Sequence, residues 1–91
     1  MVSVVIPVFN EADYLSATLD SVAEGKAQKE IIVVDAGSLD RTLEIAGQKA
    51  TRLLISSRKQ RAHQMNLGAR YARGSFLLFL HADTVPASRG A

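Results

Sequence analysis

The sequence contains no cysteine, which excludes a disulfide framework, a thiolate metal site and a cysteine nucleophile. This absence fits a reducing compartment. Long apolar runs are also missing, because the run from Phe76 to Leu80 has five residues and a membrane-spanning helix needs about 20. No basic segment precedes an apolar one at the N-terminus, so no signal peptide is predicted. We therefore expect a protein of the cytoplasm without a membrane span.

A strong charge of either sign is missing too. The 11 basic and 9 acidic residues leave a net charge of +2, which does not indicate a nucleic-acid partner. Hydrophobic residues make up 47% of the chain and charged residues 22%, as in ordinary globular proteins. With 91 residues, the chain is long enough for one small domain, which we assign to residues 1–91.

Short apolar runs alternate with segments of helical periodicity along the whole chain. The alternation predicts the order βαβαβαβ and a parallel sheet with right-handed crossovers. Apolar runs of this kind are typical of strands that are buried on both faces. We expect an α/β, Rossmann-like three-layer fold with sheet order 3-2-1-4. The predicted strands are 2–6, 30–34, 52–55 and 76–80.

Each predicted helix has start and stop signals. Asn10 can cap the first helix, which Gly25 can close, and Ser38 or Asp40 can cap the second. The third runs from about residue 60 to residue 72. We expect its inward face to carry the apolar residues Ala62, Met65, Ala69 and Ala72.

Polar residues follow the predicted strands, at the sheet edge where ligands bind in such folds. Asp35 ends the second strand and precedes Gly37. A carboxylate there can accept a hydrogen bond from a base or a ribose hydroxyl, and the glycine lets the backbone approach closely. The alternative is a purely local turn in which the Asp35 side chain caps the next helix.

His81 and Asp83 follow the most apolar strand. The carboxylate of Asp83 is placed to hold a hard cation such as Mn²⁺ or Mg²⁺, and His81 is a candidate second ligand. The alternative is that Asp83 caps a turn and His81 packs as a neutral side chain.

A basic cluster of Arg58, Lys59 and Arg61 opens the third helix. Guanidinium groups at a helix N-terminus can bind phosphate. Gln60, Arg61, Gln64 and Gly68 lie along one stripe of this helix, which suits a face near a ligand. The alternative is a solvated helix face.

Three segments resemble the family-2 glycosyltransferases, an inverting family with the GT-A fold. The segments are Val4 to Glu11, similar to V-I-P-x-x-N-E; Ile32 to Thr42, similar to V-V-D-D-G-S-x-D-x-T; and Gln64 to Asp83, similar to A-x-N-x-G…L-D-x-D. The amino-acid sequence of the third segment most resembles that of a bacterial subgroup associated with radical-SAM and selenium-linked genes. The resemblance covers nearly all 91 residues.

The resemblance implies a transferase that moves a sugar from a nucleoside-diphosphate-sugar, with uridine as the favoured base, to an acceptor hydroxyl. It places Pro7, Phe9, Asn10, Glu11 and Asp35 at the base and ribose. It places Arg61 and Asn66 near the diphosphate and sugar, and Asp83 at the metal ion. The sequence departs from the pattern twice: Ala36 replaces an aspartate that could contact ribose, and His81 replaces the first aspartate of D-x-D.

In this family the general base and the acceptor site come from the second half of the domain, which does not follow Ala91 here. We therefore assign no catalytic residue and interpret the chain as a truncated nucleotide-binding half. The alternative function is a non-catalytic module that binds nucleotide or associates with itself. The apolar strand Phe76 to Leu80 would then be a sheet edge, which favours pairing with a second chain, and we expect a homo-oligomer.

Overall fold

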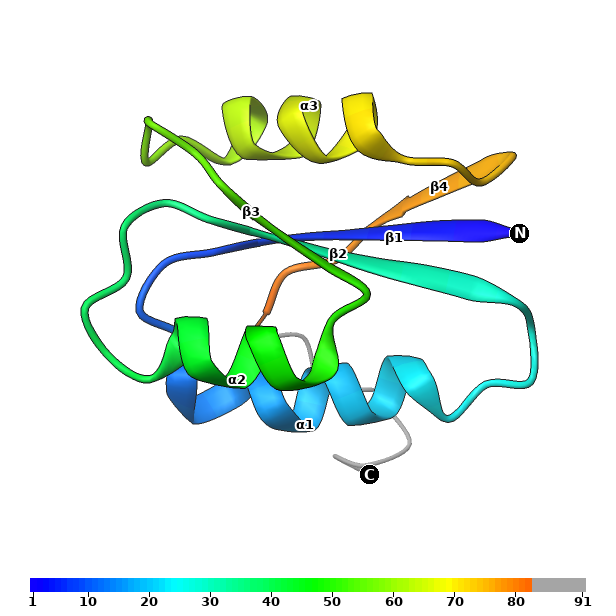
Figure 1. Ribbon diagram of the computed structural model, residues 1–91, viewed down its shortest axis with the longest axis horizontal. Coiled ribbons are helices and arrows are strands. Elements are labelled where there is room, and N and C mark those ends of the chain that lie inside the picture. Colours follow the sequence, from blue (N-terminus) through cyan, green and yellow to red (C-terminus); the bar gives the residue numbers. More distant parts are fainter. Residues whose placement is uncertain (83–91) are drawn as a thin grey trace.

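The computed structural model describes residues 1–82 as a four-stranded sheet between two helical layers (Figure 1). Helices α1 and α2 cover one face of the sheet, and α3 covers the other. The elements are β1 (Val2–Val8), α1 (Ala12–Ala23), β2 (Lys29–Asp35), α2 (Thr42–Lys49), β3 (Arg52–Ile55), α3 (Arg61–Tyr71) and β4 (Phe76–Phe79).

The strand order is β3-β2-β1-β4, and all three strand pairs are parallel. This confirms the predicted fold class and sheet order. Strand β1 is central: it pairs with β2 from Val2 to Val8 and with β4 from Val2 to Val5. The carboxyl ends of the strands therefore meet at one edge of the sheet, as the sequence predicts.

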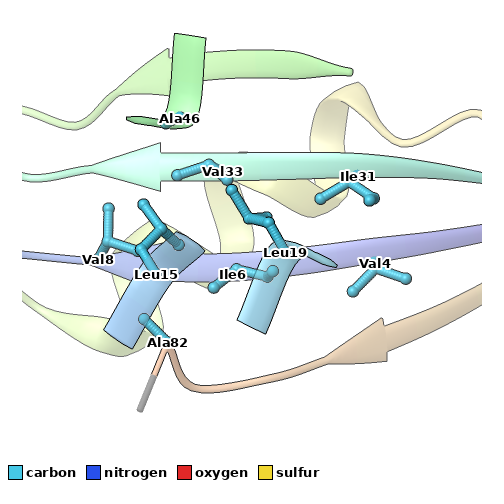
Figure 2. Packing of buried hydrophobic residues seen from close by; sticks show 9 residues of the cluster. All are labelled: Val4, Ile6, Val8, Leu15, Leu19, Ile31, Val33, Ala46 and Ala82. Carbon is cyan, nitrogen blue, oxygen red and sulfur yellow. The ribbon is translucent and has the colours of Figure 1, made fainter. Parts of the chain in front are cut away.

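Alternate residues of β1 and β2 fill two separate apolar layers, because successive side chains of a strand point to opposite faces. The layer under α1 and α2 is the larger one, and Figure 2 shows Leu15 and Leu19 of α1 lying over the sheet. Its buried members are Val4, Ile6, Val8, Leu15, Leu19, Ile31, Val33, Ala46 and Ala82.

The layer under α3 is thinner. Val5, Ile32 and Val34 are its buried members, with Leu67 of α3 packed partly against them. The helix can approach closely because Gly68 faces the sheet: a Cβ atom at this position would lie 2.4 Å from Val5 Cγ1.

The predicted inward face of α3 is wrong except at Ala72, which follows the last residue of the helix and packs partly against the apolar layer beneath it. Ala62 is exposed, and Met65 and Ala69 are only partly buried, whereas Gln64 and Gly68 are the buried residues of this helix. The reason is that glycine allows the close helix–sheet contact and that Gln64 satisfies its amide on the strand ends. Gln64 and Gly68 therefore face the sheet.

The predicted caps are partly correct. Asn10 does not cap α1; its Oδ1 accepts a hydrogen bond from the Leu39 amide instead. Asp40 caps both helices, because its carboxylate accepts from the Ala12 amide of α1 at 3.2 Å and from the Thr42 amide of α2 at 2.9 Å. The hydrogen bond from the Thr42 hydroxyl is the main reason that the pKa of Asp40 is lower than usual.

A buried polar cluster joins the opposite end of the sheet to the turn that precedes β4. Ser3 donates to the Glu30 carboxylate and accepts from the Gly74 amide at 2.8 Å, while the Arg73 amide also donates to Glu30. These hydrogen bonds, with that of Ser3 the largest cause, lower the pKa of Glu30. Gly74 is required at this turn, since a Cβ atom there would lie 2.6 Å from the Met1 carbonyl oxygen.

Within residues 1–82, no helix combines the length and the apolar character that crossing a bilayer would require.

Candidate functional site

A pocket of about 400 Å³ lies where β1 ends and α3 begins. Its position follows from the topology, because the loop after a central strand and the N-terminus of a crossover helix meet at this edge of a parallel sheet. The pocket is lined by Pro7, Val8, Phe9, Glu11, Lys59, Arg61 and Gln64.

One wall of the pocket combines an aromatic ring with a cation. The Lys59 ammonium lies 4.0 Å from the centroid of the Phe9 ring, within the range of a cation–π interaction. The pair places an aromatic ring and a positive charge on the same pocket. A planar base with an attached phosphate has matching chemistry.

The guanidinium of Arg61 lies between two other polar side chains. One nitrogen is 3.9 Å from Glu11 Oε1 and another is 2.5 Å from His81 Nδ1. The side chain of Arg61 remains half exposed. Arg61 therefore has guanidinium N–H groups that can reach an anion in the pocket.

The contact with Arg61 constrains the imidazole of His81. A guanidinium only donates, so Nδ1 of His81 accepts and the proton of the neutral ring is on Nε2. In this arrangement neither ring nitrogen offers a lone pair to a metal ion. Within residues 1–82, no group of three or more histidine or acidic side chains is placed to hold a metal. Asp83, the predicted principal ligand, lies outside the described residues.

Asp35 lies at the end of β2, fully buried. Its carboxylate accepts hydrogen bonds from the Gly37 amide at 2.8 Å, the Ser38 amide at 2.9 Å and the Ser38 hydroxyl. This is the local turn that the sequence offered as the alternative to nucleotide binding. Gly37 has a φ of 96°, which explains why a glycine is needed there.

The two loops after β1 and β2 are bound to each other. The Asn10 amide donates to Ser38 Oγ at 2.8 Å, and Asn10 Oδ1 accepts from the Leu39 amide at 2.7 Å. The Glu11 amide donates to Thr42 Oγ1 at 2.8 Å. Asn10 has a φ of 51°, a conformation that asparagine tolerates better than most residues. The loops thus form one support for the pocket.

The structure therefore brings together four of the predicted nucleotide-binding residues, Pro7, Phe9, Glu11 and Arg61, on one pocket. Asn10 and Asp35 lie in the loops that support it and do not line it. Asn66 lies on a separate, smaller hollow of about 150 Å³ beside α3, with His63, Leu67 and Arg70.

The sequence prediction did not name Val8, Lys59 and Gln64 singly as nucleotide-binding residues, although Val8 and Gln64 lie within the ranges 7–11 and 61–66 that it placed near the nucleotide, and all three line the pocket. Lys59 belonged to the basic cluster, and its distance from Phe9 in the sequence concealed the contact. Gln64 belonged to the polar stripe. Its buried position was hidden because apolar periodicity assigns glutamine to the solvent side of a helix.

Residues 3–89 match the family model described as Glycosyl transferase family 2. The chain is 38% identical over 94 residues to glycosyltransferase AglE of Haloferax volcanii, a match that covers 93% of this chain and 31% of the relative. It is 41% identical over 90 residues to a PGL/p-HBAD biosynthesis glycosyltransferase of Mycobacterium bovis, with 91% and 35% covered. The chain thus spans about a third of the length of these curated relatives.

Solved structures agree with the sequence relatives. The mannosyltransferase PcManGT from Pyrobaculum calidifontis, in complex with GDP-Man and Mn²⁺, superimposes with a TM-score of 0.81 at 28% identity over 90% of this chain and 27% of that one. Glucosyl-3-phosphoglycerate synthase from Mycobacterium tuberculosis, in complex with Mn²⁺, UDP and glucosyl-3-phosphoglycerate, gives a TM-score of 0.75 at 26% identity, with 93% and 34% covered.

The strand order, the pocket at the strand ends and the match over residues 3–89 agree with one another. The chain belongs to glycosyl transferase family 2, and its sheet has the GT-A arrangement of its structural neighbours.

Proposed function

We propose that the pocket at the end of β1 binds the nucleoside diphosphate part of a nucleotide-sugar donor, as part of a glycosyltransferase that acts on an acceptor hydroxyl. The observation that carries this proposal is the placement of Lys59 and Arg61 on the same pocket as the Phe9 ring. Relatives solved with UDP or GDP-Man support it. UDP-sugar is the proposed donor class.

In this proposal Pro7 and Phe9 contact the base, and Arg61 and Lys59 contact the diphosphate. Breakage of the bond between sugar and phosphate places negative charge on the departing nucleoside diphosphate. Cations held beside that group lower the energy of the transition state. We extend the proposal to Glu11 at the ribose side, with Asn10 and Asp35 holding the loops that support it, and to Asn66 near the sugar.

A divalent cation, Mn²⁺ or Mg²⁺, is proposed on Asp83. When bound, such an ion would supply charge stabilisation for the diphosphate. His81 could join it only after its contact with Arg61 is broken. Solved neighbours that contain Mn²⁺ support the use of a metal.

The acceptor, the inverting stereochemistry and the bacterial radical-SAM-associated subgroup are proposals that rest on the resemblance of motifs. None of the carboxylates in residues 1–82 is assigned as general base. Glu11 is near Arg61, whereas Asp35 and Asp40 are engaged in turns and caps.

The replacement Arg61→Ala tests the diphosphate assignment. We expect it to weaken UDP binding about tenfold or more, because a charge-assisted contact is lost, and to change uridine binding little. Arg41→Ala is the matched control, since Arg41 pairs with Glu44 on exposed surface and does not line the pocket. Calorimetric titration measures both ligands. An equal loss for uridine and UDP would remove Arg61 from the phosphate.

The replacement Asp83→Ala tests the metal assignment. We expect UDP binding by the unchanged chain to be stronger with Mn²⁺ than with a chelator, because an ion held by Asp83 would offset the negative charge of the diphosphate. The variant should lose this difference. Calorimetry with and without the metal measures it, and an unchanged metal dependence in the variant would contradict the assignment.

A second candidate function is a module that binds nucleotide without turnover or associates with itself. The observation that favours self-association is the exposed apolar strand β4, whose four side chains are 42–71% exposed.

A further inference from the structure

Gln64 lies in the first half of α3, faces the sheet and is only 3% exposed. It also lines the pocket. A buried amide at this place needs hydrogen-bond partners, because an unsatisfied buried polar group is costly. The hydrogen-bond partners of this amide determine which of its polar atoms is available to a ligand in the pocket.

Both hydrogens of the Gln64 amide are taken by the strand ends. Nε2 donates to the Val8 carbonyl oxygen at 3.0 Å and to the Val34 carbonyl oxygen at 2.9 Å. Carbonyl oxygens can only accept, so the NH₂ group must face the strands. The orientation of this amide is therefore determined by its partners, unlike that of many glutamines.

The remaining polar atom of the side chain is Oε1. Within residues 1–82 no group donates a hydrogen bond to Oε1. Oε1 is also not one of the solvent-inaccessible polar atoms that lack a hydrogen-bond partner in this part of the chain. Oε1 is therefore the polar atom that Gln64 presents to the pocket, as a neutral acceptor held in place from behind.

The carboxylates nearby in residues 1–82 are occupied or carry charge. Both oxygens of Asp35 accept hydrogen bonds within the turn after β2, and the next residue, Ala36, has an apolar side chain. Glu11 is charged and lies near Arg61. A neutral N–H donor on a ligand would thus find its uncharged partner in Gln64.

We propose that Gln64 Oε1 accepts a hydrogen bond from the ring imino N–H of the donor's base and so determines which bases the pocket takes. Uracil at N3 and guanine at N1 carry this hydrogen at neutral pH. Cytosine at N3 and adenine at N1 carry a lone pair there, which would face the lone pairs of Oε1. The proposal rests on the nucleotide-binding function above, and it excludes donors whose base is cytosine or adenine.

The test compares UDP with 3-methyl-UDP, in which a methyl group replaces the imino hydrogen, and with CDP. For the 91-residue chain we expect UDP to bind about tenfold or more tightly than either, the usual effect of leaving a buried acceptor unpaired. Binding of 2′-deoxy-UDP, measured in the same way, tests contacts to the ribose 2′-hydroxyl separately from contacts to the base. Dissociation constants are measured by calorimetry.

Gln64→Lys is the informative variant, because an ammonium can still donate to the Val8 and Val34 carbonyl oxygens but cannot accept. The ratio of UDP to 3-methyl-UDP affinity should fall to about one, whatever the added charge does to both affinities. Gln48→Lys, on the exposed side of α2, adds the same charge and should keep the ratio. Thermal melting shows whether each variant is folded.

The outcomes separate the two proposals. If the folded chain binds UDP but does not distinguish it from 3-methyl-UDP, the role of Gln64 is wrong and the nucleotide site stands. If Gln64→Lys abolishes discrimination against 2′-deoxy-UDP instead, Oε1 contacts the ribose and the base assignment is overturned. If no nucleoside diphosphate binds, the proposed function fails and the base assignment fails with it.

Discussion

At the scale of single residues, Gly68 determines how closely α3 approaches the sheet. The Cβ atom of an alanine would lie 2.4 Å from Val5 Cγ1 and 3.2 Å from Val34 Cγ2. We expect Gly68→Ala to lower the free energy of unfolding by about 1–3 kcal/mol, the usual cost of overpacking a core. Urea unfolding followed by circular dichroism measures the change.

Gly47→Ala is the matched control for that experiment. Gly47 also lies inside a helix, but a Cβ atom there would have no neighbour within 4 Å. Alanine is the better helix former, so we expect a gain of up to about 1 kcal/mol. Equal losses in the two variants would mean that helix approach at Gly68 is not limited by the Val5 side chain.

Single residues also show the limit of the sequence prediction. Asp35 and Asn10 were correctly placed at the strand ends, because topology alone brings those positions together. Their hydrogen bonds could not be predicted, since a carboxylate in a D-x-G-S segment can bind a ligand or its own turn with the same residue types. The hydrogen bonds from Gly37 and Ser38 show that Asp35 makes the turn, which the φ of 96° at Gly37 allows.

At the scale of elements, the strand positions were predicted well. The expected strand at 52–55 is β3 as observed, and the strand expected at 30–34 is β2, one residue longer at each end. In β2, a continuous run of β-branched residues flanked by turns leaves little ambiguity. The face of α3 was wrong because close packing by Gly68 and hydrogen bonding by Gln64 override apolar periodicity.

The cluster of Ser3, Glu30 and Gly74 joins β1 and β2 to the turn that precedes β4. The pKa of Glu30 is lowered from 4.5, first by the Ser3 hydrogen bond and then by that of the Arg73 amide. A carboxylate whose pKa is lower in the folded than in the unfolded chain stabilises the folded state at pH values above the pKa of the unfolded chain. That contribution is lost as the pH falls through the folded pKa of Glu30.

We therefore expect the free energy of unfolding to fall below about pH 4.5 and to fall less steeply in Glu30→Gln. Urea unfolding at a series of pH values between neutral and acid conditions measures both curves. Glu44→Gln removes an exposed carboxylate and should leave the pH dependence of the free energy of unfolding as steep as in the unchanged chain. Parallel curves for the unchanged chain and Glu30→Gln would show that the cluster does not couple folding to protonation.

At the scale of the whole molecule, β4 is one of the two edge strands of the sheet within residues 1–82 and is apolar on both faces. Phe76 is 71% exposed, and Leu77, Leu78 and Phe79 are 42–47% exposed. An exposed apolar edge strand favours pairing with another chain. We expect the chain to associate with a second copy at micromolar concentration through a two-fold contact of this edge.

Sedimentation velocity over a range of concentrations measures that association. Phe76→Lys places a charge on the edge and should shift the chain to a monomer. Leu39→Lys is the control, because Leu39 is 92% exposed and lies in the loop between β2 and α2, away from β4. A monomer at every concentration in the unchanged chain would refute self-association.

The parallel pairing of β4 with β1 has a consequence for the order in which the molecule opens. Strand β4 is joined to β1 over the register Val2 to Val5, whereas β1 and β2 are paired from Val2 to Val8 and buried on both faces. Amide hydrogens of β4 should therefore exchange with solvent through local opening, and those of β1 through global unfolding. His81 lies two residues after the end of β4 and contacts Arg61, so each local opening of β4 would release the guanidinium from its imidazole neighbour.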